Sequence, residues 1–352
     1  RNTTTAINNN AFGYSALRNN NNNNNNAFGY AALYENTSGG ANCAFGHNAL
    51  NANTTASNNT AVGYASLGAN TTGADNSALG VNTLAANTTG ANNTGIGYAT
   101  LSENTTADSN TAIGHSALKE NTTGTRNTAV GAVALDALTT ENDNTAIGYA
   151  ALSSEVSGFR NTAVGSGSGA NQNGGTNNTL LGYNAGSDIS TGDANTFIGS
   201  DCGDANTTAS NNTAVGQAAL GANTTGTTNV AVGTSALTAN TTASNNTGIG
   251  YNALAANTTG AQNTAVGRLA LDASTTANDN TAIGNASMTA TTTGHSNASV
   301  GSGSMRNNTE GRNNAVLGKD AMDANTTGKN NSVFGYSALR ENIVGSNNSA
   351  FG

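Results

Sequence analysis

The side chains that most often carry catalysis or bind metals are few in this chain and are scattered along it. The 352 residues include 3 histidines, His47, His115 and His295, and 2 cysteines, Cys43 and Cys202. Nucleophilic catalysis needs a converging set of a nucleophile, a base and an acid. Three histidines spread over the whole length do not predict such a set, and we interpret them as variable surface positions.

The acidic residues show no metal-binding or glycosidase pattern either. They are dispersed, and no calcium-loop spacing of the form D-x-D-x-D-G surrounds any of them. Glycoside hydrolysis requires two carboxyl groups about 5–9.5 Å apart, and the sequence points to no such pair. We therefore expect no catalytic residue, no metal site and no cofactor, and predict that the protein is not an enzyme. Representative acidic positions are Asp136, Asp143, Asp188, Asp201 and Asp204.

What the sequence does contain is a repeat. A glycine recurs every 17 residues from Gly29 to Gly352, after a first step of 16 from Gly13. An Asn stands four residues before each of these glycines, and Leu or Met stands four residues after it in 17 of 20 repeats. The consensus is N-T-A-[VIF]-G-Y-x-A-L-x-x-N-T-T-G-x-x. Residues that represent the three ladders are Asn59, Gly63, Leu67, Asn110, Gly114, Leu118, Asn144, Gly148 and Leu152.

Two further positions of the repeat carry functional hypotheses. Eight of the 9 tyrosines directly follow the repeated glycine, either for packing or as an aromatic strip that stacks on sugars: Tyr14, Tyr30, Tyr64, Tyr98, Tyr149, Tyr183, Tyr251 and Tyr336. The N-T-T segment is either turn chemistry or a series of glycan acceptors, and its Thr residues are candidates for O-linked sugar. The candidate asparagines are Asn53, Asn70, Asn87, Asn104, Asn121, Asn206, Asn223, Asn240, Asn257 and Asn325.

The repeat predicts an all-β fold, a parallel β-solenoid with one 17-residue repeat per coil and about 21 coils over residues 1–352, without a break between domains. We expect T-A-V-G to be a strand whose Thr and bulky residue point inward. We expect A-A-L to form a second strand and the repeated Asn to form stacked amide ladders. The Ala and Gly face would let another backbone pack closely. Repeats near residues 155–205 lose the Leu, which indicates a packing variant or a recognition site.

Composition excludes several partners. The net charge is −8, charged residues make up 9%, and no Lys/Arg run is present, so nucleic acid is not an expected partner. No apolar run approaches the ~20 residues of a membrane helix, so we expect no membrane insertion. The chain opens with Arg1 inside a repeat, and we interpret it as a segment of a longer fibre.

The repeats resemble those of trimeric autotransporter adhesin heads and look still more like the arrays of phage tail-fibre-like proteins. The resemblance rests on N-T-A-[VI]-G-Y-x-A-L, as in Asn59–Leu67, Asn110–Leu118, Asn144–Leu152 and Asn246–Leu254. It covers essentially the whole chain. It implies a left-handed, trimeric β-roll on a cell surface or a virion.

The predicted function is therefore a structural or adhesive extracellular fibre: a surface adhesin shaft, a secreted filament or a virion fibre. Its expected partners are copies of itself, as a homotrimer or an end-to-end polymer, and cell-surface glycans or a host receptor. One alternative is a self-assembling glycosylated filament. Another is an ice-binding β-solenoid, which the inward direction expected for the strand Thr makes the weaker choice.

Overall fold

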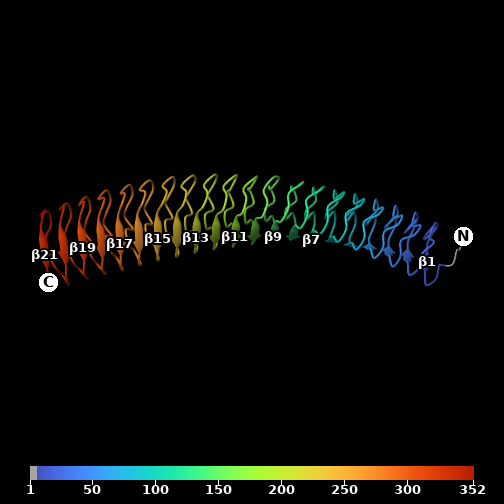
Figure 1. The fold of residues 1–352 in the computed structure, drawn as a ribbon, viewed down its shortest axis with the longest axis horizontal. Helices are drawn as coiled ribbons and strands as arrows, with labels where there is room; N and C mark the ends of the chain where they lie inside the picture. Colours follow the sequence, from blue (N-terminus) through green and yellow to red (C-terminus); the bar gives the residue numbers. More distant parts are fainter. Residues whose placement is uncertain (1–5) are drawn as a thin grey trace. The chain divides into compact units, whose positions relative to one another are not determined.

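The computed structural model describes residues 6–352, and these are folded as a β-solenoid of 21 three-residue parallel strands without a helix. The chain divides into two compact units, residues 1–176 and 177–352. Within each unit, every 17-residue repeat makes one coil and contributes one strand (Figure 1). The solenoid and its repeat length are thus as the sequence predicts.

The first unit contains ten strands, which occupy the T-A-φ segment just before the repeated glycine, where φ is the bulky residue. Neighbouring strands pair in parallel and in register, as in Thr111↔Thr128 and Ile113↔Val130. The strands are β1 (Asn10–Phe12), β2 (Asn26–Phe28), β3 (Cys43–Phe45), β4 (Thr60–Val62), β5 (Ser77–Leu79), β6 (Thr94–Ile96), β7 (Thr111–Ile113), β8 (Thr128–Val130), β9 (Thr145–Ile147) and β10 (Thr162–Val164).

The second unit contains eleven strands built in the same way, with pairings such as Thr264↔Thr281. They are β11 (Thr179–Leu181), β12 (Thr196–Ile198), β13 (Thr213–Val215), β14 (Val230–Val232), β15 (Thr247–Ile249), β16 (Thr264–Val266), β17 (Thr281–Ile283), β18 (Ala298–Val300), β19 (Ala315–Leu317), β20 (Ser332–Phe334) and β21 (Ser349–Phe351).

The strand faces are the reverse of the prediction. In β7 the central Ala112 is fully buried, whereas Thr111 is partly exposed and Ile113 is 37% exposed. The prediction assigned the bulkiest side chains to the core. A 17-residue coil encloses too little volume for that, because Leu and two Asn side chains already fill its interior. In most coils with an interior Leu the strand centre is therefore Ala or Gly, and Thr and the bulky residue face outward.

The expected second strand is also wrong. The segment after the glycine is a turn in which two residues take left-handed backbone angles, as at Ser116 (φ 55°) and Leu118 (φ 52°). Such angles cost an L-residue roughly 1–2 kcal/mol, which is why a Leu is not expected there. The turn directs Leu118 into the interior, where it is fully buried, and that burial offsets the strain.

The Ala and Gly face does not receive another chain's backbone. Ala112 lies inside the coil with Leu118, and Gly114 packs against the next coil of its own chain. Gly114 has φ 135°, and a Cβ atom there would lie 2.5 Å from the carbonyl oxygen of Gly131. Stacked coils approach so closely at this point that no other residue type fits.

The stacked amide ladders are confirmed. One has an Asn in every described coil, and the second is interrupted in some coils, as at Leu138. In the first, the backbone N–H of Asn110 donates to Oδ1 of Asn93 at 2.9 Å, and Nδ2 of Asn110 donates to the carbonyl of Gly124 at 2.8 Å. In the second, Nδ2 of Asn104 donates to Oδ1 of Asn87 at 2.8 Å. All of these side chains are fully buried, so the ladders bond neighbouring coils of a unit to each other through the interior.

Candidate functional site

The outward strand face is the most distinctive surface of the molecule. We define it as the first and third residues of each strand. Among the described residues, no Asp, Glu, Lys or Arg occurs in any of the 21 strands, although charged residues occupy several other positions of the coil. The third residue is always Val, Ile, Leu or Phe, and Leu79 and Ile96 are 49% and 38% exposed.

The predicted aromatic strip exists as an exposed row, and part of it is a continuous stack. Tyr14 stacks on Tyr30 with ring centroids 5.3 Å apart, and His47 stacks between Tyr30 and Tyr64 at 4.9 and 5.3 Å. All eight tyrosines of the strip are at least half exposed. His115 stacks on Tyr98 in the same manner. Two histidines therefore take the place of tyrosines in the strip.

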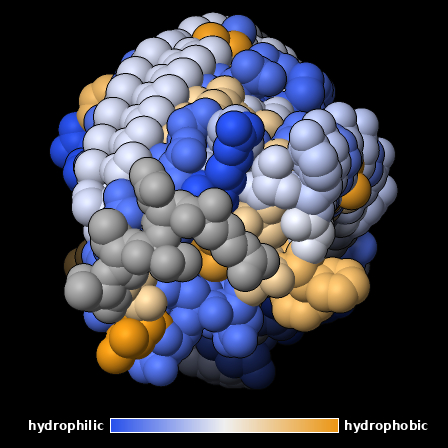
Figure 2. Space-filling view, turned by 90° about the vertical axis from the view of Figure 1, so that its right-hand side faces the viewer, coloured by the Kyte–Doolittle hydropathy of each residue, from blue (hydrophilic) through white to orange (hydrophobic). Residues whose placement is uncertain are grey.

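A second aromatic row lies on the strand face of the first coils. Phe12, Phe28 and Phe45 stack with centroids 5.2 and 5.1 Å apart. Figure 2, which looks at the N-terminal end, shows like-coloured residues of successive coils in rows, one behind another. In the second unit, Phe334 and Phe351 repeat this arrangement at 5.4 Å.

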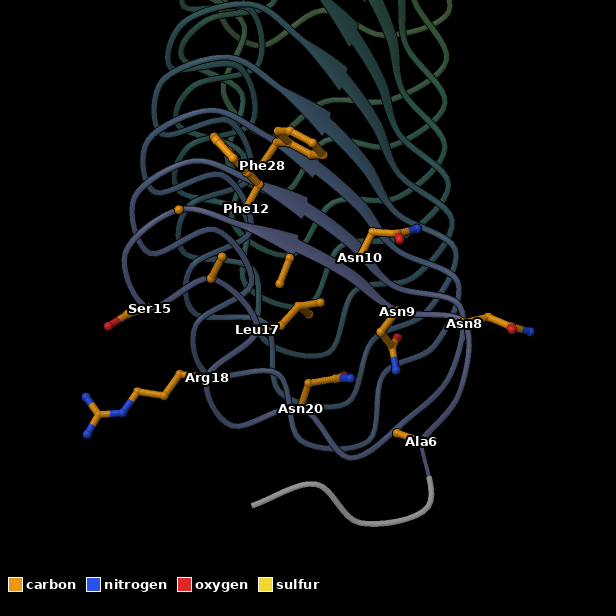
Figure 3. Close-up of a pocket in the computed structure, with 13 residues that line it drawn as sticks. Ala6, Asn8, Asn9, Asn10, Phe12, Ser15, Leu17, Arg18, Asn20 and Phe28 are labelled. Carbon is orange, nitrogen blue, oxygen red and sulfur yellow. The ribbon is translucent and has the colours of Figure 1, made fainter. Parts of the chain in front are cut away.

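A hollow of about 790 Å³ lies at the first described coil. It is lined by interior residues such as Asn9, Leu17 and Asn20, while the charged Arg18 points away from it (Figure 3). Its lining contains no acid, histidine or cysteine. The hollow exposes the coil interior and brings no reactive groups together.

The histidines and cysteines form no common site in the described part of the chain. No group of three or more His, Cys, Asp or Glu residues there is arranged to hold a metal ion. Both cysteines are free. Burial raises the pKa of the Cys202 thiol to about 12, so this thiol stays protonated at neutral pH and is a poor nucleophile. His295 contacts Ser296 at 3.2 Å and lies apart from the aromatic strip.

The acidic residues are individually placed. Partial burial raises the pKa of the Asp136, Asp204 and Asp272 carboxyls, whereas the Arg126 guanidinium holds the pKa of the Asp143 carboxyl below its usual value. The Arg126 Nε to Asp143 Oδ1 distance is 2.6 Å, across one coil spacing on the surface.

The candidate glycan acceptors lie inside the coil. Asn53 is fully buried, and its Nδ2 donates to Oδ1 of Asn36 at 2.8 Å and to the carbonyl of Ala56 at 3.0 Å. The other nine candidate asparagines are equally buried. N-glycosylation needs a free Nδ2, so the folded chain gives no access to these atoms. The sequence alone does not distinguish a glycan-acceptor Asn from an Asn of the buried amide ladder, because N-T-T satisfies both patterns.

The irregular coils are a packing variant. In β12 the strand centre is Phe197, fully buried, and Gly203 stands where regular coils have Leu. A Cβ atom on Gly203 would lie 2.5 Å from Cε2 of Phe197. The aromatic ring therefore fills the space of the missing Leu, and the interior of these coils stays closed.

The buried carboxyl of Glu155 was not predicted from the sequence. Glu155 replaces an Asn of the second ladder and is fully buried. Its Oε1 accepts from the backbone N–H of Gly174 at 2.9 Å, and its Oε2 accepts from Nε2 of Gln172 at 2.7 Å. The signal was available, because Glu155 stands seven residues after Gly148. Its bonds continue the ladder, so its role is to hold coils together.

A scan against protein-family models finds no match to this chain, and a search of curated proteins finds no relative. Within residues 6–352 there is no helix with the length and apolar character needed to cross a membrane.

Proposed function

We propose that the chain is a structural rod of an extracellular fibre, built to extend by repetition. The observation that supports this is the use of the same interior contacts in nearly every coil. Asn59 and Asn110 make equivalent bonds three coils apart, and a residue required in each coil is scaffold. Coils that contact only their neighbours give a fold whose length is set by the number of repeats.

Copies of the chain are the first partners we propose, as a homotrimer or an end-to-end polymer. The apolar third residues of the strands are exposed, and contiguous apolar surface of this kind is a common mark of association. A second partner class is a cell-surface glycan or a host receptor, for which the exposed aromatic row of Tyr14, Tyr30, His47 and Tyr64 provides a contact surface. The setting we propose is a cell surface, a secreted filament or a virion.

The glycosylated-filament alternative is favoured by a different residue. The second Thr of the N-T-T turn is exposed in most coils, as at Thr55, Thr72 and Thr89. Its hydroxyl makes no hydrogen bond within the described part of the chain, whereas the first Thr donates to the next coil, as Thr54 does to the Thr71 carbonyl at 3.0 Å. Sugar on this filament would therefore be O-linked.

The decisive experiment is the mass of the purified chain by light scattering, with electron microscopy and intact mass spectrometry alongside. A mass three times 34.6 kDa, or an extended polymer, is the expected result. A compact single chain that neither associates nor extends would overturn the fibre proposal. An added mass that a mild alkaline treatment removes would select the O-glycosylated filament.

A further inference from the structure

Besides the apolar third residues that favour association, the strand face carries hydroxyl groups that a contact with another copy would leave without partners. We call the first residues of successive strands the first file, and this file is threonine over several runs. The runs are Thr94, Thr111, Thr128, Thr145 and Thr162 in one unit, and Thr179, Thr196 and Thr213, then, after Val230, Thr247, Thr264 and Thr281 in the other. Within the described residues, the hydroxyls of these threonines have no hydrogen-bond partner. A dry interface would leave such hydroxyls buried and unpaired, which is unfavourable.

The second file supplies branched apolar side chains beside those hydroxyls. Ile96, Ile113, Val130 and Ile147 follow one another in the first unit, and their outward exposure reaches 39% at Ile147. Thr, Val and Ile are all β-branched and have restricted χ1 angles. The side chains of both files therefore have restricted conformations before any ligand binds. The first file presents methyl and hydroxyl groups, and the second file beside it presents methyl groups.

The spacing of the two files is fixed by the backbone. In-register parallel pairing, as between β7 and β8, places like residues about 4.8 Å apart along each file, and residues i and i+2 of one strand about 6.7 Å apart. Close backbone bonds such as Gly131 N–H to the Ile113 carbonyl at 2.8 Å hold this grid. Hexagonal ice repeats along its a and c axes at spacings near these two.

The absence of charge completes the surface. Lys, Arg, Asp and Glu hold their hydration water tightly, and the described strands contain none of them. A surface that pairs free hydroxyls with methyl groups on a rigid grid can anchor a sheet of ordered water without disrupting it.

We propose that the strand face binds ice. Thr128 is the middle residue of the threonine run in the first unit, and Thr264 is the middle residue of the run Thr247, Thr264 and Thr281 in the second. The ligand is the ordered water lattice at an ice surface, held by the threonine hydroxyls and by water packed against the methyl groups. This proposal goes beyond the fibre proposal and does not depend on it, because a single folded chain already presents the face. A rod attached to a cell would use it to hold ice.

The test compares two pairs of substitutions in the full chain. Thr128→Lys with Thr264→Lys places a long charged side chain inside each array. Thr123→Lys with Thr259→Lys makes the same chemical change at exposed turn positions of the same units. Thermal hysteresis, the shape of ice crystals and the uptake of labelled protein into a growing ice hemisphere are measured for each. Circular dichroism and light scattering establish that the variants fold and whether they associate.

The expected result is ice shaping, thermal hysteresis and uptake for the natural chain and the turn pair, and loss of all three for the folded strand pair. Thr128→Ser with Thr264→Ser, which removes only the methyl groups, should weaken the activity while retaining the fold. A natural chain that is excluded from ice overturns the proposal, as does a strand pair as active as the turn pair. If the natural chain is instead associated and inert, and the strand pair separates the copies, the face belongs to a second copy.

Discussion

The regular coil that contains β7 and the irregular coil that contains β12 solve the same packing problem with exchanged residues. In the regular coil a small Ala112 faces a buried Leu118, and in the irregular coil a large Phe197 faces Gly203. Backbone angles at the two turn positions are alike, with φ 52° at Leu118 and 58° at Gly203. The interior of a coil therefore fixes a volume and a backbone path, and leaves open which position supplies the volume.

The amide ladders behave differently from the apolar positions. An Asn ladder side chain has partners above, below and across the turn, so no neighbouring residue can take over its bonds. Where the second ladder is interrupted at Leu138, the Oδ1 of Asn121 lies buried without a partner. Volume can be exchanged within a coil, whereas the hydrogen bond between coils is lost when an apolar residue such as Leu138 takes the place of the amide.

The largest predicted loss of stability comes from changing the Phe197 and Gly203 pair of the irregular coil. Phe197→Ala removes the ring that fills the interior and should destabilise the chain by about 3–5 kcal/mol. Gly203→Leu alone should also destabilise it, because its Cβ would meet the ring of Phe197. The double variant rebuilds the Ala and Leu pair of a regular coil and should recover most of the loss.

Urea unfolding of the four proteins in that cycle gives the coupling energy. A strongly favourable coupling is expected, since the two positions share one space. The matched control is Ala112→Gly with Leu118→Ala in the regular coil, where both changes remove volume and their losses should reinforce each other. Additive losses at Phe197 and Gly203 would mean that the volume rule does not hold.

The second effect concerns the ladder of the regular coils. Asn87→Leu keeps the size of the side chain but removes the donor to Asn70 Oδ1 at 2.9 Å and the acceptor of Asn104 Nδ2 at 2.8 Å. Each buried group left without a partner costs about 1–3 kcal/mol. The urea midpoint should fall clearly, and it should remain unchanged for Thr106→Val at an exposed turn position. Equal stability of Asn87→Leu and the natural chain would show that the amides act only as fillers.

The sequence was sufficient for the period, the Asn and Leu ladders and the solenoid, because these depend on spacing alone. The direction of the strand faces could not be obtained in this way. Alternation separates Thr111 and Ile113 from Ala112, but it does not say which side is inside. That depends on how much volume one coil encloses, which only the path of the turn at Ser116 and Leu118 determines.

The candidate site could likewise be predicted only in part from the sequence. The exposed tyrosine row follows from a repeated position, and its stacking follows from the coil spacing. The free threonine hydroxyls were missed, because the bulky neighbour at the third strand position was taken as core. For the N-T-T asparagines the sequence left two interpretations open, turn residue or glycan acceptor. The same spacing that makes them frequent places them in an amide ladder such as that of Asn53 and Asn70.

The third predicted effect is a difference in reactivity between the two cysteine thiols. Cys202 occupies the position of the regular coil's Ala117 and is fully buried, whereas Cys43 faces outward from β3. At pH 8 a thiol reagent should modify Cys43 alone in the folded chain and both thiols in denaturant. The pKa of the Cys202 thiol is raised by burial to about 12, against ~8.5 for an unperturbed thiol.

The sign of the pH effect follows from that pKa. The unfolded chain loses the thiol proton first, so the contribution of Cys202 to stability is complete below pH ~8.5 and declines as the pH rises toward 12. Cys202→Ala, which restores the regular residue, should remove this part of the alkaline decline. Rapid modification of both thiols in the folded chain would contradict the burial of Cys202.

The smallest predicted effect is an increase in stability. In the second unit the Asn ladder is interrupted at Ser274, where Oγ of Ser274 and Oδ1 of Asn257 are both buried without a partner. Ser274→Asn places an Nδ2 within reach of Asn257 Oδ1 and of the carbonyl of Ala277, as the ladder does at Asn257 itself. A repaired bond contributes about 0.5–1.5 kcal/mol, so the urea midpoint should rise slightly. Ser274→Ala is the control, because it removes one unpaired group without repairing the ladder. If the two variants are equally stable, relief of the unpaired hydroxyl explains the gain, and continuity between coils contributes nothing at this position.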